Sequence, residues 1–487
     1  MIHRFARPLG FLPLCLTLIP AAATAQGVRG WAATNVRYLE MQPLQLDTAQ
    51  VGNVVYDAEG NARVDGQLIW CTAAPCLYYR PVAVQSAVVG SQDLGFTAWG
   101  LGVTGLSFTT LLRARDHLSG ELDWPLADDP LDVLLGYAEL RRSGFRIRAG
   151  RQESPSGLGF SAFDGASVRW DGASLWAEGF GGRSLARGLS EPAREALRGI
   201  EDFVRDQEAY LFGGAAGIRW GVSGVGVRYQ REIHSDRAGI ISERAALDFQ
   251  TVLPWHIRLR SSVDYDVAFG HFGKANVTLQ RGILDGRLIT EMEARRYVPY
   301  FDMSTIWGFF SPVPFHEVRF RMSAGLGRGT GLQMAVAARE YDEPGTTVVF
   351  RPLENRGYRA ELKGMWSPVE KVQVDAGYDL DWAAHAFLHS FDGSVAVDWL
   401  PRLRTRFFGT SFQQFEAFRL GDGRAYGGGI GAEWTVTDRI LLDGLVSVIR
   451  QEAGRGGEND AWNQTRASFG LRYEFGDDPG LARRRRR

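Results

Sequence analysis

The sequence predicts an all-β protein, a closed antiparallel transmembrane β-barrel of about 22 strands, within a range of roughly 18–24. Three observations predict this fold. Polar and apolar residues alternate in short runs along most of the chain, tight connections alternate with long ones, and tryptophans lie beside the tight ones. The composition agrees, since the chain has 59 glycines and 12% aromatic residues, a combination typical of barrels and sandwiches.

The alternation is clearest between Lys371 and Trp382. Polar residues and one glycine fill one register, whereas Val372, Val374, Ala376, Tyr378, Leu380 and Trp382 fill the other. A period of two predicts a strand with one polar and one apolar face. Similar runs occur at 254–267 and 466–475, so the pattern continues almost to the end of the chain.

Strands of this kind are expected along the whole mature chain. Most are long enough for the roughly 9–11 residues that a tilted strand needs to cross a bilayer. We expect them at about 28–41, 80–102, 104–115, 131–142, 144–152, 163–171, 172–182, 208–220, 223–234, 240–252, 255–268, 272–281, 284–295, 316–326, 330–341, 356–366, 370–382, 387–398, 402–414, 424–435, 438–451 and 461–475.

The connections are sorted by length. Tight turns are expected at 102–105, 143–144, 171–172, 221–224, 253–255, 283–286, 367–371, 400–402 and 435–438. The intervening connections are long or irregular, as at 42–79, 116–130, 183–207, 296–315, 342–355 and 451–460. Short periplasmic turns with long extracellular loops are typical of outer-membrane barrels, and a soluble sandwich has no reason to sort its loops in this way.

Six tryptophans decide which face meets lipid. Each lies beside a tight turn, in the apolar register: Trp170, Trp220, Trp255, Trp366, Trp399 and Trp434. This arrangement predicts an aromatic girdle at one membrane interface. The apolar face therefore points outward and the polar face lines a lumen. Because an open sheet edge in lipid would leave backbone groups unpaired, the first and last strands must pair.

The ends of the chain predict export. Residues 1–25 have a basic start, an apolar stretch and the motif Ala23-Thr24-Ala25, which together indicate a signal peptide. The barrel is then expected at 26–475, followed by a basic periplasmic tail at 476–487. The run Arg483–Arg487 in this tail either contacts anionic lipid headgroups or is a solvated, disordered end. We expect the mature protein in the bacterial outer membrane.

Other functional classes find little support. The net charge of −1 gives no reason to expect a nucleic-acid partner. In an exported protein Cys71 and Cys76 most simply form one disulfide, and no metal site or cofactor is expected. Sequence motifs of hydrolases and phosphate-binding loops are missing, and His385 with His389 is only a weak metal or catalytic candidate.

The last strand carries a resemblance to Gram-negative outer-membrane barrels of the porin-like type. The family's final strand alternates and ends in an aromatic residue, and this strand matches at Phe469, Leu471, Tyr473 and Phe475. The resemblance implies recognition by the barrel-assembly machinery. The departure is that Phe475 is followed by further residues. TonB-dependent receptors resemble the chain poorly, because they need a plug domain, and here strand-like sequence starts at Val28.

A second, weaker similarity is to porins and alginate-export-like barrels. The sequence Gly150-Arg151-Gln152 followed by Phe163-Asp164-Gly165 is similar to a pairing seen in those barrels. No substrate is assigned from it.

Charged side chains on the polar face are the candidate functional residues. Those expected to point into the lumen include Arg146, Arg148, Arg258, Arg260, Arg402, Arg404, Arg406, Asp264, Asp266, Asp375, Asp379 and Asp381. They either bias ion selectivity or pair across neighbouring strands and stiffen the wall, and pairing is favoured for most of them. Arg402, Arg404 and Arg406 are the preferred filter, because an arginine fork binds carboxylate or phosphate in two places.

Two loops are candidates for narrowing the lumen. Residues 295–317 are rich in proline and aromatics, so this loop either folds into the barrel mouth as a constriction, binds a carbohydrate or packs on its neighbours, and packing is favoured. Apolar residues at helical spacing in 191–208 predict a short amphipathic helix, which either plugs the lumen, caps the mouth or forms a lid on the outer surface.

These observations favour a passive outer-membrane channel for small polar or anionic solutes. Two alternatives stay open: a surface anchor or a polysaccharide- or protein-binding barrel with a blocked lumen, and, with less support, a barrel hydrolase. The apolar outer face is compatible with lipid contact and with association between barrels, so the sequence leaves the oligomeric state open.

Overall fold

The computed structural model describes residues 26–42, 44–49, 51–56, 62–64, 67–68, 76–120, 131–153, 158, 162–185, 209–235, 239–268, 270–298, 314–327, 329–342, 356–383, 386–417, 421–453 and 461–477. Several expectations fall outside these residues. They are the signal peptide at 1–25, the helix at 191–208, most of the loop at 295–317, the basic tail from 478, Cys71 and His385. The side chain of Cys76 is also outside, so the disulfide stays a prediction.

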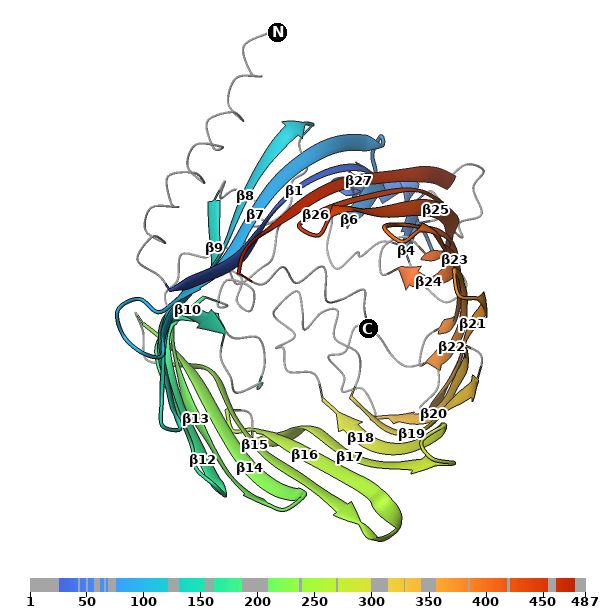
Figure 1. The fold of residues 1–487 in the computed structure, drawn as a ribbon. Coiled ribbons are helices and arrows are strands. Elements are labelled where there is room, and N and C mark those ends of the chain that lie inside the picture. The colour runs from blue at the N-terminus through green and yellow to red at the C-terminus, as the bar shows by residue number, and fades with distance from the viewer. Residues whose placement is uncertain are drawn as a thin grey trace.

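Twenty-two antiparallel strands form one sheet that closes on itself (Figure 1). The strands are β1 Gly27–Met41, β7 Gln85–Trp99, β8 Leu106–Ser119, β9 Leu131–Arg142, β10 Phe145–Glu153, β11 Ala162–Asp171, β12 Leu175–Ser184, β13 Ala209–Trp220, β14 Ser223–His234, β15 Ile240–Leu253, β16 Ile257–Asp266, β17 His271–Ile283, β18 Leu288–Tyr297, β19 Phe315–Gly327, β20 Thr330–Tyr341, β21 Arg356–Val369, β22 Val372–Ala383, β23 Ala386–Leu400, β24 Leu403–Ala417, β25 Gly421–Thr437, β26 Ile440–Ala453 and β27 Ala461–Gly476. Each expected strand is present, so the fold class and strand count are confirmed.

The first and last strands close the ring. β1 pairs with β27 from Arg29, opposite Gly476, to Leu39, opposite Arg466, and its other edge pairs with β7. The backbone N–H of Val28 also donates to an Asp477 carboxylate oxygen at 3.2 Å. Both ends of the described chain therefore lie at the same rim, as an even strand count requires.

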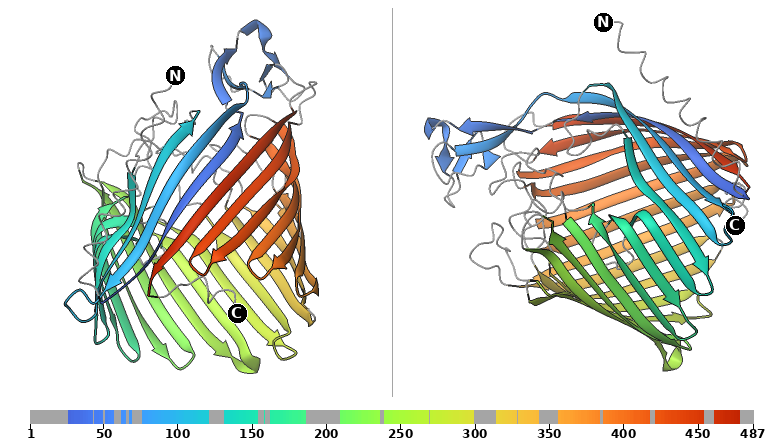
Figure 2. Two further views of the ribbon diagram at one scale, coloured as in Figure 1. Left: turned by 45° about the horizontal axis from the view of Figure 1, so that its top comes forward. Right: turned by 90° about the vertical axis from the view of Figure 1, so that its left-hand side faces the viewer.

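The first long connection contains two small sheets. In one, β2 (Leu44–Ala49) pairs with β6 (Cys76–Pro81), and in the other β3 (Val55–Tyr56), β4 (Ala62–Val64) and β5 (Gln67–Leu68) pair in order. They project beyond one end of the barrel (Figure 2). The sequence predicts only a loop here, and the second barrel strand begins at Gln85 rather than near 80.

The sorting of connections is confirmed for most of the barrel. One rim has short turns throughout, such as Ser143-Gly144, where both residues have positive φ and close a tight hairpin. The opposite rim has the long loops, but the connections at 235–239, 267–270, 384–385 and 418–420 are also short, so the exceptions number four. At 254–256 the turn includes Trp255 and His256 with left-handed φ, so this strand begins at Ile257 instead of at Trp255.

Alternation along the strands gives the barrel an apolar outside. On β21, for example, Tyr358, Leu362 and Trp366 lie on one face and are all about half exposed. Arg359, Glu361 and Lys363 occupy the intervening positions and make ion pairs on the other face. An apolar outer belt around a charged interior is the arrangement of a transmembrane β-barrel.

The described part of the chain includes no helix that is long and apolar enough to cross a membrane.

Candidate functional site

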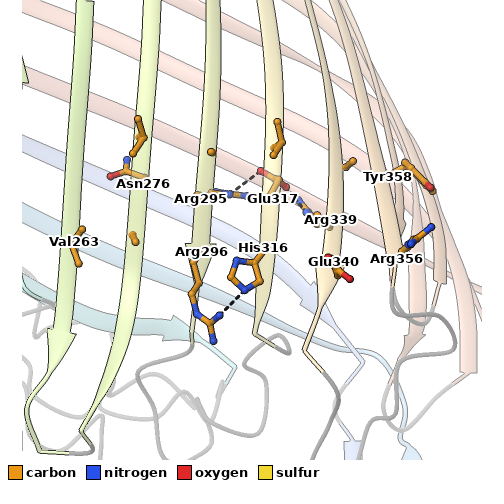
Figure 3. A pocket seen from close by; sticks show the side chains of 15 residues that line it. Val263, Asn276, Arg295, Arg296, His316, Glu317, Arg339, Glu340, Arg356 and Tyr358 are labelled. Carbon is orange, nitrogen blue, oxygen red and sulfur yellow. Dashed lines mark hydrogen bonds and ion pairs between the residues drawn. The ribbon is translucent and has the colours of Figure 1, made fainter.

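The inner wall of the barrel is the candidate site, because it carries most of the charged side chains. Its most buried charge is Glu317 on β19, which is 2% exposed. Glu317 lies between Arg295 on β18 and Arg339 on β20 (Figure 3). Arg295 Nε is 2.8 Å from Glu317 Oε1 as an ion pair without hydrogen-bond geometry, and Arg339 Nε donates to Glu317 Oε2. Arg339 also reaches Asp381 on β22 at 3.2 Å, so the ladder spans five strands.

An aromatic cluster lies beside this ladder, towards the long-loop rim. The guanidinium carbons of Arg295 and Arg339 lie 5.3 and 5.1 Å from the centroid of the Phe315 ring. Phe315 in turn packs against Tyr297 and Tyr341, with centroids 5.5 and 5.8 Å apart. Cations over aromatic faces gain electrostatic energy, so this cluster fixes both arginines.

Most charged residues expected in the lumen are paired. Arg148 is 2.5 Å from Glu139, and Arg146 is 3.9 Å from Glu178. Of the expected aspartates, Asp379 is 4.0 Å from Lys363, and Asp381 is 3.2 Å from Arg339. Asp375 accepts from Gln373, and Asp264 and Asp266 also have partners. These carboxylates and arginines stiffen the wall, and sequence reasoning could not identify their partners because the register between strands was unknown.

The arginines chosen as a filter do not form a free cluster. Arg402 is 3.5 Å from Asp438, and Arg404 donates to Gln373 at 2.9 Å and is 4.0 Å from Asp398. Only Arg406 of this group has neither an ion pair nor a side-chain hydrogen bond within the described residues.

Arg258 and Arg260 share this property with Arg406. Among the side chains that the structure describes, no ion pair or hydrogen bond is formed by either residue. Both lie near the start of β16, close to the short turn that precedes this strand. Arg406 likewise lies near the start of β24. β24 is eight strands along the 22-strand ring from β16, so Arg406 lies at a different part of the short-turn rim from Arg258 and Arg260.

Leu158 lies against the inner wall of the barrel. Leu158, in the connection after β10, is 1% exposed, and its carbonyl oxygen accepts from Arg244 Nη1 at 3.2 Å. Arg244 lies on the inner face of β15, opposite Gln230 and Asp266. Leu158 therefore lies against the inner wall at β15, several strands away from β10. The sequence did not predict this contact, because Leu158 lies outside the alternating runs.

Truncating Leu158 tests its position against the inner wall. We expect Leu158→Ala to lower the free energy of unfolding by about 2 kcal/mol, because a fully buried leucine loses its packing. Urea unfolding of the protein in lipid vesicles measures the change. The control is Leu175→Ala on the outer face of β12, where the side chain is about half exposed. Equal stability of the two variants and the wild type would contradict the buried position of Leu158.

The two halves of the porin-like motif meet across strands. Gly150 lies opposite Gly165, and Arg151 makes two hydrogen bonds of 2.8 Å to Asp164. Gln152, 1% exposed, accepts from the Ser167 hydroxyl at 2.7 Å. The motif is therefore a cross-strand brace between β10 and β11.

The other expected residues have simpler surroundings. The six girdle tryptophans are all exposed beside short turns. On β27, Phe469, Leu471 and Tyr473 are exposed on one face, and Phe475 stacks on Tyr473. His389 stacks on Tyr378. Within the ranges that the structure describes, no group of three His, Cys, Asp or Glu side chains could hold a metal ion.

Comparison with solved structures finds proteins that include one named as a porin and one named as an outer-membrane protein. A BenF-like porin from Pseudomonas fluorescens Pf-5 is 10% identical with a TM-score of 0.41, covering 92% of this chain and 99% of that chain. OccAB4 of Acinetobacter baumannii is 8% identical with a TM-score of 0.39, covering 93% and 99%. OccK9 (OpdG) of Pseudomonas aeruginosa is 12% identical with a TM-score of 0.39, covering 92% and 98%. At such low TM-scores and identities, neither fold nor function is inferred from these likenesses.

No family model matches the chain, and no curated protein matches it in sequence.

Proposed function

We propose that this barrel is a passive outer-membrane channel for small polar or anionic solutes. The observation that carries the proposal is the charged inner wall of a closed 22-strand ring, in which Arg258, Arg260 and Arg406 have no counter-ion within the described residues. A ring of this width is too large to be filled by its own side chains. None of the described strands lies inside it (Figure 1).

The proposed orientation follows from the outer face. The six tryptophans beside the short turns would anchor the barrel at one interface, with the short turns in the periplasm and the long loops outside the cell. Both ends of the described chain then lie on the periplasmic side. The aromatic alternation of β27, ending at Phe475, would be the signal that the assembly machinery reads.

The proposed mechanism is diffusion down a gradient. Paired charges keep the wall polar and rigid, whereas the three arginines without a described counter-ion add positive potential near the periplasmic mouth. Guanidinium groups bind carboxylate or phosphate through two parallel hydrogen bonds, so anionic solutes are favoured over cations of equal size. No cofactor takes part in this process.

Conductance of the refolded protein in a planar bilayer tests the proposal. We expect stable single-channel conductance steps. In a salt gradient, we expect the sign of the reversal potential to show that anions permeate more readily than cations. A cation preference would contradict the role of the arginines. Absence of steps from protein shown to be inserted would contradict the channel itself.

A blocked binding barrel is the second candidate. Two observations favour it, the small sheets β2–β6 and β3–β5 that project beyond the rim, and the inward position of Leu158. In that case the projecting sheets would bind a polysaccharide or protein, and the same bilayer recording would stay silent.

A further inference from the structure

A hollow of about 600 Å³ lies in the barrel wall across β16 to β21, close to the long-loop rim (Figure 3). Its floor is made by one row of outward residues that lie opposite one another in register: Val277, Ala294, Val318 and Ala338. The next outward row towards the short turns carries large exposed side chains: Leu279, Met292, Phe320 and Val336. Because the alanine side chains are short, the outer surface is lower at Ala294 and Ala338 than at the neighbouring row of large side chains.

A polar row borders the hollow on its other side. Arg296, His316, Glu340 and Arg356 are consecutive cross-strand neighbours, and they share the outward face with the apolar floor. Arg296 is 3.0 Å from Asp342 and also contacts His316. Within the described residues, neither Arg356 nor Glu340 has an ion pair or a hydrogen bond. Arg356 thus presents a guanidinium group with its donors available.

The polar row lies at the height expected for lipid headgroups. Arg356 and Trp366 are ten residues apart on β21. With a rise of about 3.3 Å per residue and a tilt of about 40°, this separation is roughly 25 Å along the barrel axis, which is the height of the apolar belt. If the tryptophans mark one interface, Arg356 marks the other.

Aromatic residues flank the hollow. Tyr265 and Phe272 pack at 5.2 Å on one side, and Tyr358 and Trp382 at 6.1 Å on the other. Between these two pairs the outward row is polar instead of aromatic, although aromatic residues are the usual choice at an interface. The interruption coincides with the recessed floor.

We infer that this hollow binds one phosphorylated lipid of the outer leaflet. The ester and first methylene groups of an acyl chain rest on the alanine floor, and the phosphate accepts hydrogen bonds from Arg356 and Arg296. Charge-assisted bonds from an arginine fork to phosphate are strong and directional. Glu340 opposes the phosphate as a neighbouring anion, whereas Asp342 holds Arg296 in place.

Native mass spectrometry of the delipidated, folded barrel tests this site. The probes are phosphatidic acid and the diacylglycerol with the same acyl chains. We expect R296Q/R356Q to bind phosphatidic acid about tenfold more weakly, with diacylglycerol binding unchanged. The matched control is R281Q, which removes an exposed arginine from the outward register of β17 at the short-turn rim. Equal losses in R281Q and the double variant would overturn the proposal.

Two further arms separate a lipid site from a site for free phosphate. Ala294→Leu with Ala338→Leu fills the floor and should weaken phosphatidic acid binding while both arginines remain. Excess inorganic phosphate should displace phosphatidic acid only slightly. Insensitivity to the leucines, or full displacement by inorganic phosphate, would contradict a lipid site. Glu340→Gln should strengthen binding, and weaker binding in that variant would contradict the placement of the phosphate.

Discussion

Replacing Glu317 with glutamine should lower the free energy of unfolding by about 3 kcal/mol, at the lower end of what loss of one partner from a buried ion pair costs. Glu317 is 2% exposed and faces Arg295 and Arg339, of which Arg339 is itself almost buried. Glutamine keeps the size but removes the negative charge, so Arg295 loses its carboxylate partner and Arg339 keeps Asp381 as its remaining carboxylate partner among the described residues. Urea unfolding of the protein in lipid vesicles, followed by heat-modifiable migration on gels, measures the change.

Glu291→Gln is the matched control. Glu291 lies on the inner face of β18 and pairs with Arg321 at 2.9 Å, but both side chains are partly exposed. Pairs of this kind contribute about 0–1 kcal/mol, because water solvates the remaining charge. Equal destabilisation by the two substitutions would show that burial of Glu317 has no special weight.

The sequence predicted the fold almost completely, for a physical reason. In a membrane barrel each strand has one face towards lipid and one towards the lumen. The alternation of polar and apolar residues can therefore be recognised within a single strand, as in Val372 to Trp382. The tight turns are also local, as Ser143-Gly144 shows. The small sheets at 44–81 were missed because they lie outside lipid, where no such constraint acts on the strands.

The ion pairs could not be predicted in the same way. Alternation tells which face Glu317 or Arg404 occupies, but their partners depend on the stagger between neighbouring strands. Arg404 was expected in a free cluster with Arg402 and Arg406, yet it contacts Gln373 and Asp398 on the strands before it. The position of Leu158 is still harder to predict from the sequence, because it depends on a contact with Arg244, which lies far along the chain.

Neutralising Arg258, Arg260 and Arg406 together should remove most of the proposed preference for anions. A unit charge acting over about 8 Å of water contributes about 0.5 kcal/mol, roughly a twofold bias in local ion concentration. The charge raises the local anion concentration and lowers the cation concentration by this factor, so one arginine changes the ratio of anion to cation roughly fourfold. We therefore expect the triple substitution to lower the permeability ratio of anion to cation at least about fourfold. Reversal potentials of the three-glutamine variant in dilute salt gradients measure this ratio.

The dependence on salt distinguishes a field effect from a change of pore shape. At 1 M salt the screening length falls to about 3 Å, so the variant and the wild type should then have the same permeability ratio. A difference that persists at high salt would mean that the substitutions narrowed or distorted the lumen. Arg281→Gln removes the same charge from the outward face of β17, and we expect its reversal potential to match that of the wild type. Because only the lumen-facing arginines act on the permeating ion, a shift in this control would contradict the assignment of Arg258, Arg260 and Arg406 to the selectivity of the pore.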